Sequence, residues 1–228
     1  MLPALVLILL FIILLFPQFW VQKVIKKYSS PIETLPGTGG ELAKHLVDRF
    51  KLDGVSIKKV ENGNDHYNPE TKTIALSESN HDEKSLAAVT IAAHEFGHAL
   101  QHNTNYKPLL LRTTLAKFAA AAEKIASVIL IASPFAFILG KIPAVGLIML
   151  LAGFTIMCLP VILHIITLPV EFDASFNRAL PILSEGEYLS PSTMPIAKKI
   201  LTAAALTYVS ASLSSLLNFY RWFLILRR

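Results

Sequence analysis

Residues 92–99 read Ala-Ala-His-Glu-Phe-Gly-His-Ala and contain the spacing His-Glu-x-x-His. Residues four apart on an α-helix lie about 40° apart around its axis, so His94 and His98 project from one face. Two neutral imidazoles on one face can bind a borderline-soft ion such as Zn²⁺. Glu95, between them, can take a proton from a water molecule beside that ion. A shuffled chain of this composition would contain the spacing only about 0.01 times.

The residues around this motif are apolar, among them Ile91, Phe96 and Leu100. The motif helix is therefore predicted to be largely buried. Buried histidine and glutamate side chains need partners. An alternative interpretation is a helix whose polar residues only satisfy one another. Because the spacing is so rare by chance, a metal site is the favoured hypothesis.

A third ligand is expected elsewhere, because a catalytic zinc usually has three protein ligands and one open position. The candidates lie in residues 168–175, which read Leu-Pro-Val-Glu-Phe-Asp-Ala-Ser. Glu171 and Asp173 are two residues apart, so on a helix only one can face the motif helix. The longer side chain favours Glu171, and Ser175 would then share its face and could orient an imidazole. If Asp173 faced the motif instead, Asn177 would take that place. Alternatively, both acids only stabilise the N-terminus of a helix after Pro169.

The motif belongs to a polar insert, residues 23–117, that is predicted to be a small α+β unit. The patterns favour a helix over 41–50, strands over 55–60 and 71–76, and a helix from about Ser77 to about His102. The second strand precedes the motif helix, so it is expected at the edge of the cleft, where an extended peptide could pair with it. His66 or Tyr67, in the loop before that strand, could donate a hydrogen bond to an oxyanion.

The rest of the chain is too apolar for a soluble domain. Hydrophobic residues make up 53% and charged residues 16%, against roughly 45–50% and about 25% in soluble chains. Charge-poor runs predict an N-terminal anchor at 1–22, a transmembrane hairpin at 118–168 and a C-terminal membrane helix at 200–228, with a polar segment at 169–199. The first run has no basic residue before it and no small-x-small cleavage site, which favours an anchor over a signal peptide. The single Cys158 excludes an intrachain disulfide.

Basic residues cluster beside the apolar runs, where membrane topology explains them better than a nucleic-acid partner does. Three lie on the side opposite the motif: Lys141, Arg227 and Arg228. Nine lie on the motif side: Lys23, Lys26, Lys27, Arg112, Lys117, Lys124, Arg178, Lys198 and Lys199. The positive-inside rule therefore places the catalytic side in the cytoplasm.

Several stretches together resemble one protein family, the membrane-embedded neutral zinc metallopeptidases of the YugP-like type. Besides residues 92–99, they are Pro36-Gly37-Thr38-Gly39, Asp65-His66-Tyr67-Asn68-Pro69, residues 168–175, and Ala203-Ala204-Ala205-Leu206-Thr207-Tyr208-Val209. The resemblance implies zinc, peptide hydrolysis and a multi-pass membrane location. The chain is also similar to gluzincins, in which a glutamate on a second helix completes the zinc site, and that residue would be Glu171. Ser175 stands where many gluzincins have an aspartate.

The predicted fold is mainly α, with a small α+β zincin-like catalytic unit packed on about four transmembrane helices of a multi-pass cell-membrane protein. The predicted function is a zinc metallopeptidase, expected to be an endopeptidase. His94, His98 and Glu171 would bind one Zn²⁺, and Glu95 would be the general base for a zinc-activated water. The expected partners are a peptide or protein substrate, which can itself be membrane-associated, and the lipid bilayer. The rival hypothesis is a non-catalytic membrane scaffold or metal-binding module that keeps the peptidase fold.

Overall fold

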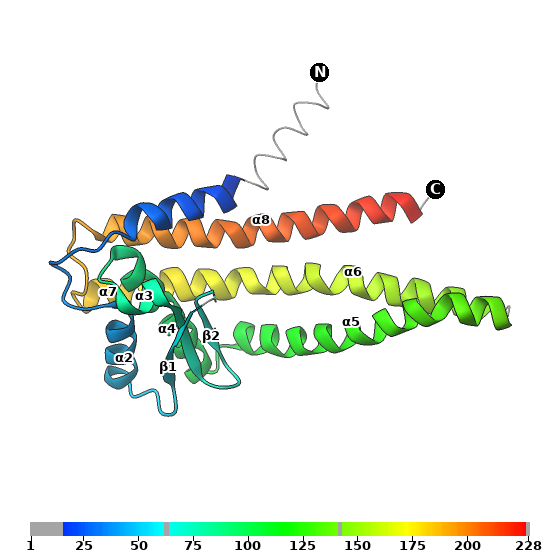
Figure 1. Cartoon of the computed structure of the whole chain (residues 1–228), viewed down its shortest axis with the longest axis horizontal. Coiled ribbons are helices and arrows are strands. Elements are labelled where there is room, and N and C mark those ends of the chain that lie inside the picture. Colours follow the sequence, from blue (N-terminus) through cyan, green and yellow to red (C-terminus); the bar gives the residue numbers. More distant parts are fainter. Residues whose placement is uncertain (1–15, 62–63, 141–142, 227–228) are drawn as a thin grey trace, which may run out of the picture.

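The computed structural model describes residues 16–61, 64–140 and 143–226. It is mainly helical with one small sheet, and a compact head lies at one end of three long helices (Figure 1). The long helices are α5 (Lys107–Gly140), α6 (Pro143–Phe172) and α8 (Met194–Leu226). The head contains α2 (Gly39–Arg49), β1 (Ser56–Val60), β2 (His66–Asn68), β3 (Thr73–Ser77), α3 (Glu78–Asp82), α4 (Leu86–Asn103), the π-helical segment η1 (Asp173–Ala179) and α7 (Leu180–Glu185).

The sheet has three strands in the order β1-β3-β2, with β1 parallel and β2 antiparallel to β3. Both strands predicted from sequence are present, but β2 lies where a loop was expected. The prediction that the second strand forms the cleft edge is wrong, because β3 is hydrogen-bonded on both sides. Ile74 of β3 pairs with Ile57 on one side and Tyr67 on the other. The edges of this sheet are therefore β1 and β2.

The helices of the head begin at local caps. Thr38 and Glu41 form a reciprocal capping box that starts α2, so the helix begins at Gly39, two residues before the predicted start. The predicted helix from Ser77 to His102 is two helices, because the chain is extended at Glu83 and α4 starts at its own cap, Ser85. Helix α4 is buried among α2, α8 and η1.

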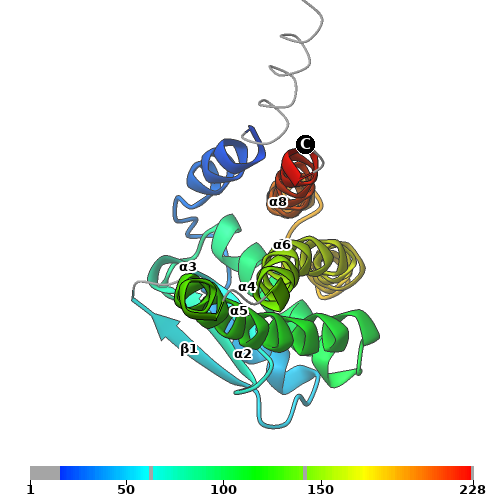
Figure 2. The ribbon, with the colours of Figure 1, turned by 90° about the vertical axis from the view of Figure 1, so that its right-hand side faces the viewer.

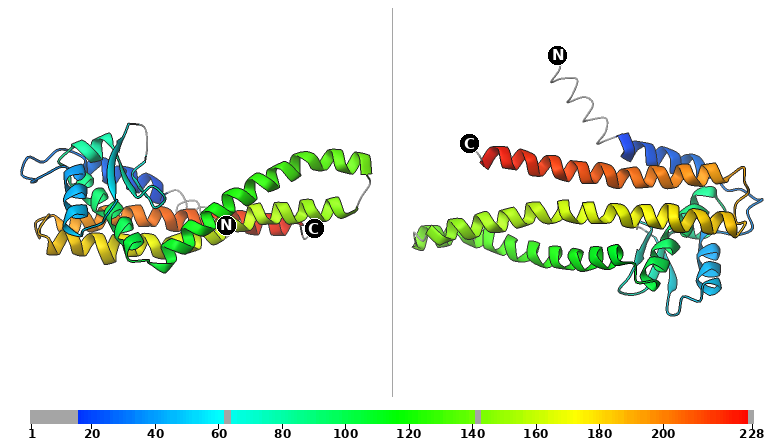
Figure 3. Two further views of the ribbon diagram at one scale, coloured as in Figure 1. Left: turned by 90° about the horizontal axis from the view of Figure 1, so that it is seen from below. Right: turned by 180° about the vertical axis from the view of Figure 1, so that it is seen from behind.

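The long helices extend away from the head. Seen end-on, α6 lies between α5 and α8 (Figure 2). Helices α5 and α6 run together as a hairpin to the end farthest from the head (Figure 3). Helix α6 continues through Pro160 and Pro169. The polar segment predicted to start at Pro169 therefore begins as an unbroken helical continuation into η1.

Two helical stretches of the described residues are long and apolar enough to cross a membrane, Leu159–Glu185 and Met194–Leu217. The prediction of about four spans is therefore wrong in number for this part of the chain. Helix α5 carries charges as far along as Lys124, which leaves residues 125–140, about 24 Å of helix, free of charge. The N-terminal anchor falls mainly on residues 1–15, outside the described residues.

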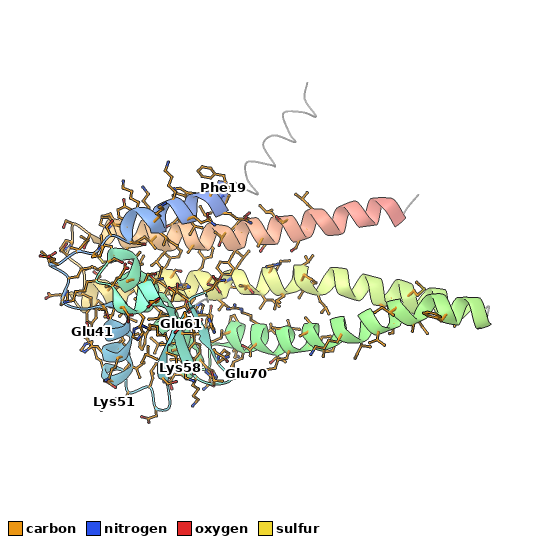
Figure 4. The ribbon with its side chains drawn as sticks, viewed as in Figure 1. Phe19, Glu41, Lys51, Lys58, Glu61 and Glu70 are labelled. Carbon is orange, nitrogen blue, oxygen red and sulfur yellow. The ribbon has the colours of Figure 1, made fainter. Side chains whose placement is uncertain are left out.

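Apolar side chains point outward along the long helices. Phe118, Ile131 and Phe135 of α5 are 60%, 72% and 67% exposed. Phe19, in the helical residues 16–28, also lies on the outside, whereas the labelled charged residues gather around the head (Figure 4). Such a large exposed apolar surface is typical of a protein that contacts lipid or another apolar partner.

Candidate metal centre

The structure brings together two histidines of α4 and one glutamate from the end of α6. One ligand atom from each of His94, His98 and Glu171 lies within 4.8 Å of the other two. Glu171 Oε2 is 3.3 Å from His94 Nε2 and 3.4 Å from His98 Nε2. Its side chain is almost completely buried. Of the two acidic candidates, it is therefore Glu171 that meets the two histidines, whereas Asp173 meets the motif helix at Gln101.

Asp173 points elsewhere. Its Oδ2 accepts a hydrogen bond from Arg178 Nε at 2.7 Å and another from Gln101 Nε2 at 2.8 Å. Asn177 donates to its Oδ1 and is exposed, so it does not reach the histidines. Ser175 takes the predicted place, since its hydroxyl lies 3.1 Å from His94 Nδ1.

Gln101, which sequence reasoning missed, fixes the protonation of His98. Its amide nitrogen donates to the backbone oxygen of Val170 and to Asp173 Oδ2, both at 2.8 Å. The amide oxygen must therefore be the atom that lies 3.0 Å from His98 Nδ1. An amide oxygen only accepts, so Nδ1 carries the proton. In the neutral imidazole, Nε2 then has a free lone pair directed at Glu171.

The donor atoms of His94, His98 and Glu171 are arranged to bind a cation. Glu171 Oε2 is buried and has no hydrogen-bond partner. When His98 is a neutral imidazole, its Nε2 and Glu171 Oε2 are two acceptors that face one another at 3.4 Å. An unsatisfied buried carboxylate oxygen is costly, whereas a positive ion between these atoms would satisfy all of them. Two imidazole nitrogens and one carboxylate oxygen are a ligand set typical of catalytic zinc.

The other oxygen of Glu171 is held by a residue that sequence reasoning counted only as a flanking charge. Arg112 of α5 donates from Nη1 to Glu171 Oε1 at 3.1 Å. The guanidinium thus leaves Oε2 as the free atom that faces the histidines. The sequence signal was weak, because Arg112 is one basic residue among several at the start of a long helix.

Glu95 is buried beside this cluster but is not part of it. The pKa of the Glu95 carboxyl is raised to about 7, mainly by burial and also by the negative charges of Glu171 and Asp65, while His94 opposes the shift. A carboxyl group with a pKa near neutrality can both accept and return a proton.

A cavity of about 430 Å³ opens beside the cluster at the junction of the head and the long helices. Its walls come from β2 and the turn after it, α4, the first turns of α5, and α8. The residues that reach it include Glu95, Tyr67, Arg112 and Tyr208. Lys117 of α5 and Glu70 also line it, and they form an ion pair at 2.8 Å (Figure 4 labels Glu70 beside α5).

Comparison with known proteins agrees with this chemistry. The family model described as "Putative neutral zinc metallopeptidase" matches residues 3–227. The chain belongs to this family. It is also 34% identical over 209 residues to the "Putative membrane protease YugP" of Bacillus subtilis (strain 168), covering 91% of this chain and 89% of that protein. No solved structure matches the chain.

Two residues considered as oxyanion donors are already engaged. The Tyr67 hydroxyl is 2.8 Å from Nδ1 of His102, and burial raises the pKa of Tyr67 to about 12. His66 is exposed, and its Nδ1 lies 2.8 Å from the backbone oxygen of Asn64. Tyr208, from α8, lines the cavity with Glu95 and was not singled out from the sequence.

Gly97, inside the motif, allows α4 and η1 to approach closely. A Cβ atom at this position would lie 2.8 Å from the backbone oxygen of Ala174. Gly97→Ala should therefore push η1 away and destabilise the fold by about 1–3 kcal/mol. Because Glu171 lies three residues before Ala174, zinc binding should weaken as well. Thermal unfolding and zinc content of the purified variant measure both effects.

Gly153 provides the matched control, because a Cβ atom there would meet nothing within 4 Å. Gly153→Ala should leave stability and zinc content unchanged or slightly improve stability. Wild-type unfolding and zinc content in Gly97→Ala would contradict the close packing of α4 on η1.

Proposed function

We propose that the chain is a membrane-bound zinc endopeptidase in which His94, His98 and Glu171 hold one Zn²⁺. The observation that carries the proposal is the position of Glu171 Oε2, which is buried without a hydrogen-bond partner and lies 3.3 Å from His94 Nε2 and 3.4 Å from His98 Nε2. When bound, a zinc ion at such a site lowers the pKa of water to about 7 and polarises a carbonyl group. Family membership supports peptide bonds as the substrate.

Glu95 acts as the general base in this proposal. Its carboxylate takes a proton from the attacking water and passes it to the leaving amine. The pKa of about 7 supports both steps, since the carboxyl group can exchange a proton near neutral pH. Tyr208 is the proposed donor to the oxyanion, because its phenol lines the cavity while Tyr67 is bound to His102.

The proposed substrate is an extended peptide segment that pairs with the free edge of β2. This strand lines the cavity with its residues His66, Tyr67 and Asn68. An edge strand offers backbone donors and acceptors to an incoming chain. A segment bound along a strand needs no chain terminus at the site, which favours internal cleavage.

Cleavage of a mixed peptide library by the full chain in lipid nanodiscs tests the function. Activity that disappears with a zinc chelator and returns with added zinc is the expected result. A chain that binds zinc but cleaves no peptide would instead favour the non-catalytic metal-binding module.

In this proposal the chain is a multi-pass protein of the cell membrane, and its head lies in the cytoplasm. Two apolar helical stretches and the name of the related membrane protease support membrane association. The basic residues Lys198 and Lys199 stand near the head end of α8, where the positive-inside rule favours the cytoplasm.

Cysteine labelling tests this orientation. In a Cys158→Ser background, Ser79→Cys on α3 should resist an impermeant thiol reagent added to intact cells, whereas Lys141→Cys should react. Both positions should react after the cells are permeabilised. Labelling at position 79 alone in intact cells would reverse the orientation.

A further inference from the structure

The fully buried amide of Gln101 joins both halves of the candidate metal centre. It lies on α4, three residues after His98, and is 0% exposed. Its oxygen accepts from His98 Nδ1, and its nitrogen donates to Val170 O and Asp173 Oδ2. Both donations of the amide nitrogen and the contact of the amide oxygen are thus made to residues around the metal centre.

The two acceptors of the amide nitrogen flank Glu171 in sequence. Val170 is the residue before it, and Asp173 is two residues after it. The carboxylate of Asp173 is itself fixed by Arg178 at 2.7 Å. Gln101 therefore ties the segment that carries Glu171 to the helix that carries both histidines.

We propose that Gln101 is a positioning residue that holds the Nδ1–H form of His98 and, through the same amide, holds Glu171 opposite it. This inference rests on the proposed zinc site. Histidine ligands of metals depend on a partner at the other ring nitrogen, which fixes their tautomer and orientation. A glutamine serves here because one side is an acceptor for His98 and the other a donor to the Glu171 segment.

The test measures zinc affinity of the purified full chain by competition with a chromophoric chelator. Gln101→Leu removes both functions of the amide, and zinc affinity should fall about 10–100-fold. Asn103→Leu, an exposed amide-to-leucine change on the same helix, is the matched control and should bind zinc as wild type does.

Exchanging the functional groups of residues 101 and 173 tests whether zinc affinity depends on the hydrogen bonds of Gln101 or only on the packing of its side chain. Gln101→Glu alone keeps an acceptor for His98 Nδ1. It also places a carboxylate against the carboxylate of Asp173, so zinc affinity should fall. Adding Asp173→Asn removes the second charge and places an NH₂ group against the new carboxylate, but Arg178 then loses Oδ2, the oxygen that it shares with Gln101. The double variant should recover part of the lost zinc affinity, because its carboxylate at position 101 accepts from His98 Nδ1 and no longer faces a second carboxylate, although Val170 O still lacks its donor. A leucine at position 101 cannot do this.

The outcomes are distinct. Failure of the wild-type chain to bind zinc would overturn the proposed function itself. Wild-type zinc binding with undiminished affinity in Gln101→Leu would overturn only the role of Gln101. If Gln101→Leu does not fold, the Gln101→Glu/Asp173→Asn double variant still provides the test. A zinc affinity of the double variant no higher than that of Gln101→Glu alone contradicts the proposal.

Discussion

Glu171→Ala should abolish zinc binding under conditions in which the wild-type chain holds one ion. Glu171 supplies the only carboxylate of the described cluster, and its Oε2 lies within 3.4 Å of both histidine Nε2 atoms. The change also leaves Arg112 without its carboxylate partner. An unpaired guanidinium beside the site repels a cation, so the loss should exceed the about 10–100-fold effect of removing a supporting residue. Zinc content of the purified protein, measured by mass spectrometry, gives the result.

Asp173→Ala is the matched control, because it removes a carboxylate two residues away on the same helical segment. Gln101 keeps Val170 O as an acceptor in that variant, so zinc should remain bound with a loss of at most about tenfold. Loss of metal from the Asp173 variant alone would assign the third ligand to Asp173. It would also move the role of orienting His94 from Ser175 to Asn177.

Glu95→Gln should keep zinc yet lose nearly all hydrolysis. Glu95 lies outside the three-residue cluster, so the ligands survive the change. Glutamine has nearly the same shape and cannot accept the proton from water, so kcat should fall about 10²–10⁴-fold. The fold should tolerate the neutral amide, because the pKa of about 7 shows that burial already disfavours the charged carboxylate. Turnover and zinc content of the same preparation test both statements.

Glu61→Gln is the control for this variant, since Glu61 is an exposed carboxylate of the head (Figure 4). It should cleave peptides as wild type does. Near-wild-type turnover in Glu95→Gln would refute the role of Glu95 as base.

The sequence predicted the parts of the site that follow from helix geometry. His94 and His98 share a face because they are four residues apart, and Ser175 reaches His94 because it shares a face with Glu171. These relations hold within one helix and need no knowledge of the fold. The choice of Glu171 over Asp173 rested on the length of the side chain, on the return of the chain to the motif side and on the family resemblance.

Contacts between distant segments could not be predicted in the same way. Gln101 is recognisable only when residues 170–173 are seen against α4, and Arg112 only when α5 is placed beside Glu171. Strand β2 was missed because three residues, His-Tyr-Asn, show no apolar alternation. Its pairing with β3 is what makes β3 a central strand and corrects the predicted cleft edge.

The zinc X-ray absorption spectrum of the purified wild-type chain tests the central claim most directly, because it identifies the atoms bound to the ion. The account predicts one ion per chain, with two imidazole nitrogens and oxygen ligands only. Cys158, the single cysteine, should contribute no sulfur. A sulfur ligand, a shell without imidazole, or a chain that retains no zinc would contradict the metal centre of His94, His98 and Glu171.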